Sequence, residues 1–380
     1  MGLVGGGLGL SDGELPLAGV RVVEFAQMLA GPSAGLLLAD YGAAVVKVEP
    51  VGGDRARSLR AQDQAELPAS PLFLAYNRDK ELIVADLKTE EGRAKAWALI
   101  EEADVVLESA RPGAMDRLGF GAADVFARRP DVVYASVAGF GWGERRRARG
   151  GVDMIAQAES GFMSTTGFPE NGATKVGFPV IDAATGHALC HGILAALVRK
   201  LRTGRGSWVR ASLYDVAIHL QSVMVMGYLL TGSEPVLSGN SAPHTSPADV
   251  LQCRDGAIVV AAYMPHHFKT FTSLLGLPEL ALDPRFETQD LRVEHRDELI
   301  SEIEAVLRTK NAAAWIDEFV AAGLLVAEVK DYPQLIADLD GDPESIVLTG
   351  DGQPVIAPPT RLIDAADVVG SAGGVGRVSE

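Results

Sequence analysis

The sequence predicts an α/β protein whose larger domain holds a doubly wound parallel sheet, with a second, smaller α+β domain. Three observations predict this. Apolar, β-branched runs alternate with helical patterns through the N-terminal half, which is typical of βαβ units and a parallel sheet. A hairpin signal and several helical patterns follow from residue 250. The length of 380 residues also exceeds what one hydrophobic core usually holds.

The N-terminal elements begin with a βαβ unit. Two apolar runs, Val20 to Phe25 and Ala44 to Val48, are predicted as strands, and a helix is predicted between them from Ala34 to Tyr41. Pro32 stands where a first helical turn tolerates proline. The pattern then recurs as strand 81–84, helix 90–101, strand 105–107, helix 122–128 and strand 132–136.

The turn after the first strand does not fit a dinucleotide site. Glu49 ends the second strand, where such sites carry an acid. The turn itself, however, contains only Gly31, followed by Pro32, in place of the G-x-G-x-x-G signature. We therefore expect no NAD(P) in this fold.

The C-terminal elements predict the smaller domain. A strand at Trp208–Ala211 leads into a buried helix that includes Val216 to Leu230. Beyond a loop at 232–247, the pair Asp255-Gly256 marks the turn of a hairpin between strands 250–253 and 258–262. Helical patterns follow at 265–275, 293–307 and 312–322. The predicted boundaries are 15–212 for a large Rossmann-like domain, 213–235 for a linker, 236–325 for the small domain, 326–345 for a second linker, and 346–380 for a segment that returns to the large domain.

The charge and the cysteine content of the sequence indicate which classes of binding partner and which cellular compartment to expect. The net charge of −16 argues against nucleic acid or an anionic membrane as a partner. Basic residues nevertheless gather in the first 150 residues, around Arg55, Arg78 and Arg145, which suggests that this half receives phosphate. The start of the chain lacks the pattern of a signal peptide, and Cys190 and Cys253 are far apart in apolar surroundings. We expect a cytoplasmic protein.

Asp182 is the only acid in the stretch Val176 to His187, between an apolar run and a helical pattern that continues to about Arg202. A carboxylate in this position could be a helix N-cap, accepting hydrogen bonds from free backbone N–H groups. It could also be a nucleophile in a pocket of small residues. Its placement alone leaves both interpretations open.

Several segments together resemble the family III CoA-transferases (CaiB/BaiF type), the group that includes formyl-CoA transferase, carnitine CoA-transferase and 2-methylacyl-CoA racemase. The resemblance extends from about residue 15 to about 360. It rests on the order and spacing of these segments: 17–24, Ala30-Gly-Pro32, 40–43, Val46-Lys-Val-Glu49, Asn77-Arg-Asp-Lys80, Asp86-Leu-Lys88, 103–108, 111–119, Ala156-Gln157, 164–167, Asp182 with Thr185-Gly186, 203–206, Asp255-Gly256 and Asp283-Pro284.

The resemblance implies that Asp182 is the nucleophile. In such enzymes an aspartate attacks the donor thioester and forms a mixed anhydride, and an aspartyl-CoA thioester follows. The small residues Ala183 and Ala184 would leave space for the thioester. Acyl-CoA and a small carboxylic acid would be the substrates, with no permanently bound cofactor and no metal. The resemblance also implies an open, ring-like chain that interlocks with a second copy as a homodimer.

The resemblance further implies a set of CoA-binding positions. They follow predicted strands or lie near the nucleophile, and an arginine suits phosphate oxygens because it binds them in pairs. An exposed turn residue remains the alternative for Lys88 and Arg117. The expected positions are Leu29, Ala30, Asp86, Leu87, Lys88, Ser109, Ala110, Arg111, Arg117 and Asp153.

The chain also departs from the family pattern. Formyl-CoA transferase has a glutamine where this chain has Leu29, and Gln27 is a candidate replacement. An arginine after the second strand is Pro50 here, so Arg55 or Arg57 would have to supply its charge. The C-terminal residues lack the family's Gly-Glu-His-Thr segment, which leaves open how they close the large domain.

Two alternatives to a transferase remain. A racemase would use Asp182 as a base and a histidine on the other face, but Val152 occupies that histidine's place and Met264 that of a nearby glutamate. A non-catalytic CoA-binding paralogue would bind CoA without turnover. Among other histidines, His187 is expected to face away from Asp182. His244 lies in a loop that covers the acyl pocket in relatives, where it is either a plain loop residue or a ligand for the acceptor carboxylate.

Overall fold

The structure of the chain is a computed structural model that describes residues 15–342, 345–350 and 353–363. The chain divides into two compact units. The first comprises Met1–Phe162, Val176–Met226 and Pro343–Glu380, and the second comprises Met163–Lys175 and Gly227–Asp342. Each unit has a sheet and a hydrophobic core of its own.

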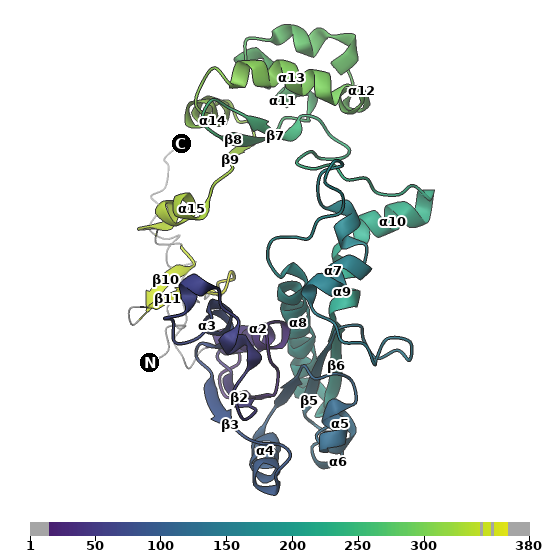
Figure 1. The fold of residues 1–380 in the computed structure, drawn as a ribbon, viewed down its shortest axis with the longest axis vertical. Coiled ribbons are helices and arrows are strands. Elements are labelled where there is room, and N and C mark those ends of the chain that lie inside the picture. Colours follow the sequence, from purple (N-terminus) through teal and green to yellow (C-terminus); the bar gives the residue numbers. More distant parts are fainter. Residues whose placement is uncertain (1–14, 343–344, 351–352, 364–380) are drawn as a thin grey trace, which may run out of the picture. The chain divides into compact units, whose positions relative to one another are not determined.

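The first unit is built on a six-stranded parallel sheet with the order β3-β2-β1-β4-β5-β6 (Figure 1). This is the strand order of a Rossmann fold, which confirms the predicted doubly wound sheet. Successive strands are added to one side of β1 up to β3 and to the other side from β4 onward, so the topological switch point of the sheet lies between β1 and β4. The strands are β1 (Arg21–Glu24), β2 (Ala44–Glu49), β3 (Glu81–Val84), β4 (Val105–Glu108), β5 (Val133–Ala138) and β6 (Ser207–Ser212).

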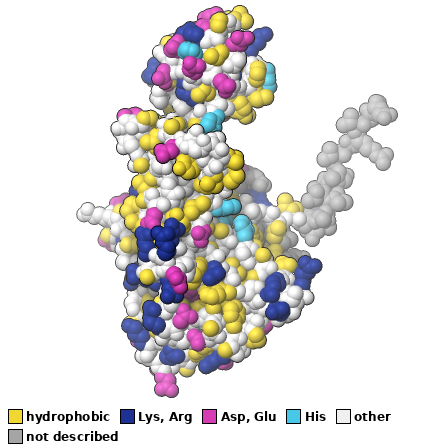
Figure 2. All heavy atoms as spheres, turned by 90° about the vertical axis from the view of Figure 1, so that its right-hand side faces the viewer, with side chains coloured by type: hydrophobic (Ala, Val, Ile, Leu, Met, Phe, Trp, Pro, Cys, Tyr) yellow, Lys and Arg dark blue, Asp and Glu magenta, His cyan; other side chains and the backbone are white. Residues whose placement is uncertain are grey.

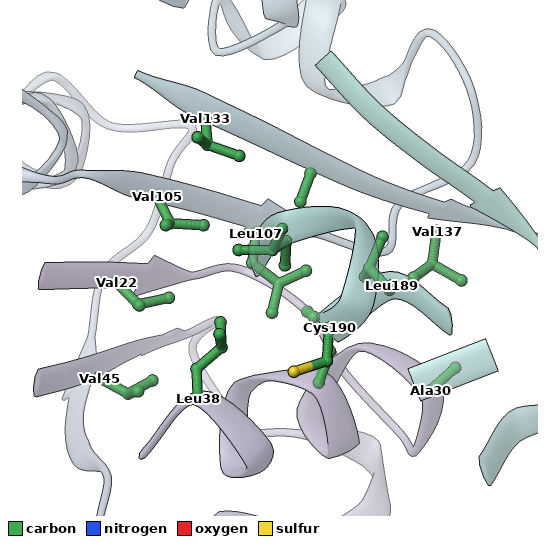
Figure 3. Close-up of a cluster of buried hydrophobic side chains, with 14 of the residues drawn as sticks. Val22, Ala30, Leu38, Val45, Val105, Leu107, Val133, Val137, Leu189 and Cys190 are labelled. Carbon is green, nitrogen blue, oxygen red and sulfur yellow. The ribbon is translucent and has the colours of Figure 1, made fainter. Parts of the chain in front are cut away.

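Alternate residues of each strand face opposite sides of the sheet, and both sides are covered by helices. On one side, Val22, Val105 and Val133 pack against α2 (Ala30–Asp40) and α8 (Val180–Thr203), as Figure 3 shows. On the other side, the adjacent residues Val106 and Tyr134 belong to a second cluster. The helices of that cluster are α4 (Glu90–Glu102), α5 (Ala114–Leu118) and α6 (Ala122–Arg128). Burial on both faces explains why these strands are nearly continuous apolar runs.

Helix α8 is the longest helix that the structure describes in this unit. It is long and apolar enough to cross a membrane by length and composition alone. One stripe of the helix, which includes Ile181, Leu189 and Ile193, is fully buried in the core against the sheet. Packing within the protein therefore accounts for the apolar sequence of α8.

Two predicted helices differ from the structure. The helix expected from Ala34 begins at Ala30, because Pro32 fits within the first turn and small residues continue the helix backward. The single buried helix expected to include Val216–Leu230 is instead two helices, α9 (Leu213–Leu220) and α10 (Ser222–Thr231), bent by 71°. Helix α10 has no buried residue, so its apolar character misled the prediction of burial.

The second unit contains the predicted hairpin. Strands β7 (Ala248–Gln252) and β8 (Ala257–Ala261) pair antiparallel, and β9 (Val326–Glu328) completes a three-stranded sheet. The helices that supply its core are α11 (Pro265–Leu274), α13 (Arg296–Leu307) and α14 (Ala312–Ala321), and α12 (Gln289–Glu294) and α15 (Tyr332–Leu339) are the others described.

The described C-terminal residues pack on the N-terminal part of the first unit, to which they also belong. Strands β10 (Val347–Gly350) and β11 (Gln353–Ile356) form a hairpin. Beyond it, the Thr360 hydroxyl lies 2.9 Å from that of Tyr41, and Arg78 donates to the carbonyl oxygen of Ile356 at 3.2 Å. These contacts show how this segment is attached without the family's usual C-terminal motif. Residues 364–380 lie outside the described part of the chain.

Candidate active site

Eight of the ten predicted CoA-binding residues follow strands at one edge of the parallel sheet, while Arg117 lies on α5 (Ala114–Leu118) and Asp153 begins α7 (Asp153–Glu159). Leu29 and Ala30 follow β1, Asp86 to Lys88 follow β3, and Ser109 to Arg111 follow β4. Since these strands are parallel, all three segments leave the same edge, where ligands bind in open α/β sheets. The backbone N–H of Gln27 donates to the Ser109 hydroxyl at 3.0 Å, which links the segments on either side of the switch point.

A buried ionic network fixes the turn between β1 and α2. The Lys47 ammonium contacts Glu24 at 2.9 Å, Asp54 at 2.9 Å and the carbonyl oxygen of Ala26 at 2.6 Å. The Lys80 ammonium contacts the other Glu24 oxygen and the carbonyl oxygen of Pro32, both at 2.8 Å. All four charged side chains are fully buried. Removing one partner of such a network leaves a buried charge uncompensated, so the turn is held in one conformation.

Helices α2 and α8 meet at a close contact beside Asp182. A Cβ on Gly186 would lie 2.6 Å from the Ser33 side chain and 3.0 Å from the carbonyl oxygen of Ala30. Only glycine allows this approach. Because residues four apart share a helix face, Asp182 lies on the same side of α8 as Gly186 and therefore faces the start of α2.

The cap of α8 is Asp153, not Asp182. One Asp153 oxygen accepts hydrogen bonds from the backbone N–H groups of Ile181 and Asp182, at 2.7 and 3.0 Å. The other accepts from the Gln157 amide, whose oxygen in turn accepts from the backbone N–H of Val176 at 2.9 Å. The N-cap position itself is Pro179, which has no side-chain cap. The capping interpretation of Asp182 is therefore wrong, because a carboxylate from α7 (Asp153–Glu159) performs that role.

The Asp182 carboxylate has no partner among the residues that the structure describes: it accepts no hydrogen bond and forms no ion pair. Burial, followed by repulsion from Asp153, raises its pKa from 3.8 to about 7. A carboxylate that is desolvated, unpaired and followed in the sequence by the small residues Ala183 and Ala184 is a candidate nucleophile, because nothing in the described residues competes with a substrate for it.

Backbone donors lie at the start of α2. Within the described residues, the N–H groups of Ala30 and Gly31 have no acceptor, as expected for a first helical turn without a side-chain cap. The first turn of α8 differs, since its N–H groups donate to Asp153, Phe178 and Pro179. A developing oxyanion beside Asp182 would therefore find its backbone donors on α2 rather than on α8.

Arg55 and Arg57 are the two candidates to supply the charge of the family arginine that is Pro50 in this chain, and the structure gives them different contacts. Arg57 makes a bidentate pair with Glu49, at 3.0 to 3.2 Å, and stacks 3.8 Å from the ring centroid of Phe73. Arg55 is exposed and has no ion pair within the described ranges. The same holds for Lys88, Arg111 and Arg117 among the described residues. These four cations are available for an anionic ligand.

Other candidates from the sequence lie elsewhere or lack suitable chemistry. His187 is on α8 with its side chain exposed, and burial and then His191 lower its pKa. His244 is exposed in a loop of the second unit. Val152 is 57% exposed and precedes α7, where it offers no base. No cluster of three or more metal-binding side chains occurs in the described part of the chain.

Sequence reasoning missed Tyr76 and the capping role of Asp153 and Gln157. Tyr76 is half-buried on α3 (Pro71–Asn77), and its pKa is raised by burial and then by the charge of Asp182. A signal was available for Tyr76, since it directly precedes the recognised segment Asn77 to Lys80. No sequence signal connects Asp153 with a helix that starts 27 residues later.

Comparison with known proteins shows which proteins this chain is similar to. The model of the family "CoA-transferase family III" matches residues 17–370. The "Probable fatty acyl-CoA transferase Rv3272" of Mycobacterium tuberculosis is 35% identical over 86% of this chain and 85% of its own length. The "Acetyl-CoA:oxalate CoA-transferase" of Acetobacter aceti is 36% identical over 85% and 84%. A crystal structure of a CAIB/BAIF family protein from Brucella suis superimposes with a TM-score of 0.83, at 32% identity over 92% of this chain and 93% of that one.

Proposed function

Because the chain belongs to the CoA-transferase family III, we propose that it moves CoA from an acyl-CoA to a carboxylic acid through covalent intermediates on Asp182. The observation that carries the mechanism is the unpaired, half-buried Asp182 carboxylate at the start of α8. An aspartate that served only the fold would be expected to satisfy its oxygens with protein donors.

Four displacements complete the reaction without water. An Asp182 oxygen attacks the thioester carbonyl, the C–S bond breaks, and CoA thiolate leaves a mixed anhydride. The thiolate attacks the aspartyl carbonyl, and the donor acid leaves with the bridging oxygen. The acceptor carboxylate then attacks the resulting aspartyl-CoA thioester and expels the thiolate. Finally the thiolate attacks the acceptor's carbonyl, which forms the new acyl-CoA and restores Asp182.

The surroundings of Asp182 support each displacement. Burial weakens the solvation of the carboxylate and makes it more basic, as the raised pKa shows, and a more basic oxygen is a better nucleophile. Asp153 holds the first turn of α8 and so fixes the nucleophile's position. The free N–H groups of Ala30 and Gly31 would stabilise the oxyanion of each tetrahedral intermediate.

CoA would bind along the carboxyl edge of the sheet. We assign its phosphate groups to Arg55, Lys88, Arg111 and Arg117, because these cations are unpaired among the described residues while Arg57 is occupied by Glu49. Arginines with no competing carboxylate keep their full donor set for phosphate oxygens.

The transfer is tested by following an oxygen atom. Succinyl-CoA and acetyl-CoA are supplied as donors, with oxalate, glutarate or mesaconate, labelled with ¹⁸O in the carboxylate, as acceptors. The relatives' names suggest these compounds. In the proposed sequence one labelled oxygen remains on Asp182 after a turnover and leaves with the donor acid in the next.

Appearance of ¹⁸O in the released donor acid, absent with Asp182→Asn, is the expected result. New acyl-CoA formed without label in the donor acid would contradict the aspartyl route. A lack of transfer combined with deuterium uptake at the α-carbon of a 2-methylacyl-CoA in D₂O would indicate a racemase instead. CoA binding with neither reaction would indicate a non-catalytic paralogue.

We also propose that the chain forms a homodimer. Helix α10 is apolar, and Val223, Leu229 and Leu230 are 81%, 69% and 76% exposed. The face that carries α10 presents many hydrophobic side chains (Figure 2). Surfaces of this kind mark protein contacts in soluble proteins. Light scattering after gel filtration is expected to give twice the chain mass of 40.0 kDa, and a monomeric mass would contradict the proposal.

A further inference from the structure

The turn between β1 and α2 contains a backbone conformation that a methionine rarely adopts. Met28 has a φ of 71°, which lies in the left-handed region. Among the residues that the structure describes, Met28 and Asp79 are the non-glycine residues with positive φ. Aspartate tolerates this region, whereas a long side chain such as that of methionine disfavours it. Such a residue stays in this conformation only when its surroundings hold it there.

The carboxylate of Asp54 holds the Met28 backbone. Its Oδ1 accepts a hydrogen bond from the Met28 N–H at 3.1 Å and another from the Ala56 N–H at 2.9 Å. Its Oδ2 lies 2.9 Å from the Lys47 ammonium, which also donates to the carbonyl oxygen of Ala26 at 2.6 Å. The buried pair of Asp54 and Lys47 therefore binds the turn at two points that are two residues apart.

The conformation of Met28 decides how α2 begins. The cap residue Leu29 makes no side-chain hydrogen bond to the first turn, so no cap fixes the start of the helix. The turn is also tight, because a Cβ on Gly31 would lie 2.3 Å from the Cβ of Ala26. A negative φ at Met28 would send the following residues in another direction and would break this close packing. The N–H groups of Ala30 and Gly31 would move with them.

We propose that Asp54 is a positioning residue: its hydrogen bond keeps Met28 in the left-handed conformation and thereby fixes the N–H groups of the first turn of α2. This assignment rests on the proposed transferase function, in which those N–H groups stabilise the oxyanion. The first turn of α2 lies against α8, since a Cβ on Gly186 would lie 3.0 Å from the Ala30 carbonyl oxygen, and Asp182 is one helical turn before Gly186. Asp54 acts through the backbone of Met28 rather than on the substrate.

Asp54 also has two structural roles. It caps the short 3-10 helix Arg55–Ser58 through the Ala56 N–H, and it balances the charge of Lys47. Neither of these roles depends on the side chain at position 28. Glycine adopts a positive φ without a side-chain penalty, so Met28→Gly removes the need for a hydrogen bond that holds this conformation. Rescue of Asp54→Ala by Met28→Gly is therefore specific to the positioning role.

Steady-state transfer from the best donor found with wild-type protein is the measurement. Asp54→Ala is expected to lower kcat about 100-fold, with KM for the acyl-CoA within about 3-fold of wild type, because misplaced donors fail in the transition state. Adding Met28→Gly should recover at least about 10-fold of this loss. Asp104→Ala is the matched control. Asp104 accepts the Arg21 N–H at 3.1 Å and pairs with Lys200 at 2.8 Å, but it precedes β4 and so lies at the opposite edge of the sheet. Its kcat should stay within about 3-fold of wild type.

The double variant separates the positioning role from the proposed function. If wild type is active and Asp54→Ala loses the same fraction of kcat with and without Met28→Gly, the positioning role is overturned while the transferase mechanism stands. If wild type shows no transfer at all, the proposed function fails. Urea denaturation then still tests the hold on Met28, because Asp54→Ala should lower the midpoint urea concentration less when Met28→Gly is also present. An equal shift in both backgrounds would overturn it.

A second pair of variants covers the case in which Asp54→Ala does not fold. Met28→Val and Met28→Asn leave the buried charges in place, but a β-branched residue resists a positive φ and asparagine tolerates it. The kcat of Met28→Val should be at least about 10-fold below that of Met28→Asn, because only valine forces the first turn of α2 to shift. Equal kcat values for the two variants would contradict the proposal.

Discussion

Replacing Asp182, the proposed nucleophile, should stabilise the protein, and increasingly so at high pH. The native pKa of Asp182 is about 7 and the unfolded value is 3.8. The folded protein therefore binds more protons than the unfolded chain between these values, and its stability falls as pH rises through this window. The two pKa values imply a cost of about 2 kcal/mol at pH 5, which grows to about 4 kcal/mol at pH 8.5. Asp182→Asn removes this cost, because the amide does not ionise.

Urea denaturation of wild type and Asp182→Asn at pH 5 and pH 8.5 checks this prediction. The stabilisation by the mutation should be larger at pH 8.5 by about 2 kcal/mol, the difference between the two costs. Asp153→Asn is the matched control, because it weakens the cap of α8 and should destabilise the protein by about 1 kcal/mol. An Asp182→Asn variant that is less stable than wild type at pH 8.5 would refute the view that this carboxylate is unsatisfied.

Three further predictions follow from the site. Arg55→Ala should raise KM for acyl-CoA about 10-fold without loss of stability. Arg57→Ala should mainly destabilise the protein, because it leaves Glu49 unpaired. Steady-state kinetics and denaturation of both variants separate the effect on KM from the effect on stability. Gly186→Ala should lower kcat/KM by about 100-fold, since its Cβ would push α2 away from α8. An unchanged kcat/KM would show that this contact does not position Asp182 relative to α2. Lys80→Met should cost about 3 to 5 kcal/mol in urea denaturation, because part of Glu24 loses its buried partner, and a loss below about 1 kcal/mol would contradict the role given to the network.

The sheet could be predicted from the sequence because its central strands β4 and β5 are buried on both faces. Strands such as Val105–Glu108 are nearly continuous apolar runs, and their alternation with helices fixes a parallel order. The exposed helix α10 could not be predicted in this way. Its sequence is as apolar as that of a core helix, and only the folded chain shows that its side chains are not covered.

The family resemblance predicted Asp182 as a candidate nucleophile, whereas its local sequence alone left a helix cap open as well, and neither predicted its surroundings. Asp182 is the only acid in its stretch, whereas Asp153, which accepts a hydrogen bond from the Asp182 backbone N–H, lies 29 residues earlier on a separate helix. Helix periodicity carries no information about such contacts between elements. The choice between Arg55 and Arg57 likewise required the position of Glu49, which pairs with only one of them.

Mass spectrometry of the enzyme during turnover tests the central claim most directly. Wild-type protein is mixed with succinyl-CoA or acetyl-CoA, quenched in acid and digested, and the peptide that contains Asp182 is examined. A CoA or acyl adduct on Asp182, absent from the Asp182→Asn variant, is the predicted result. Transfer activity with no adduct on this peptide, or with an adduct on another residue, would contradict the assignment of Asp182 as the nucleophile.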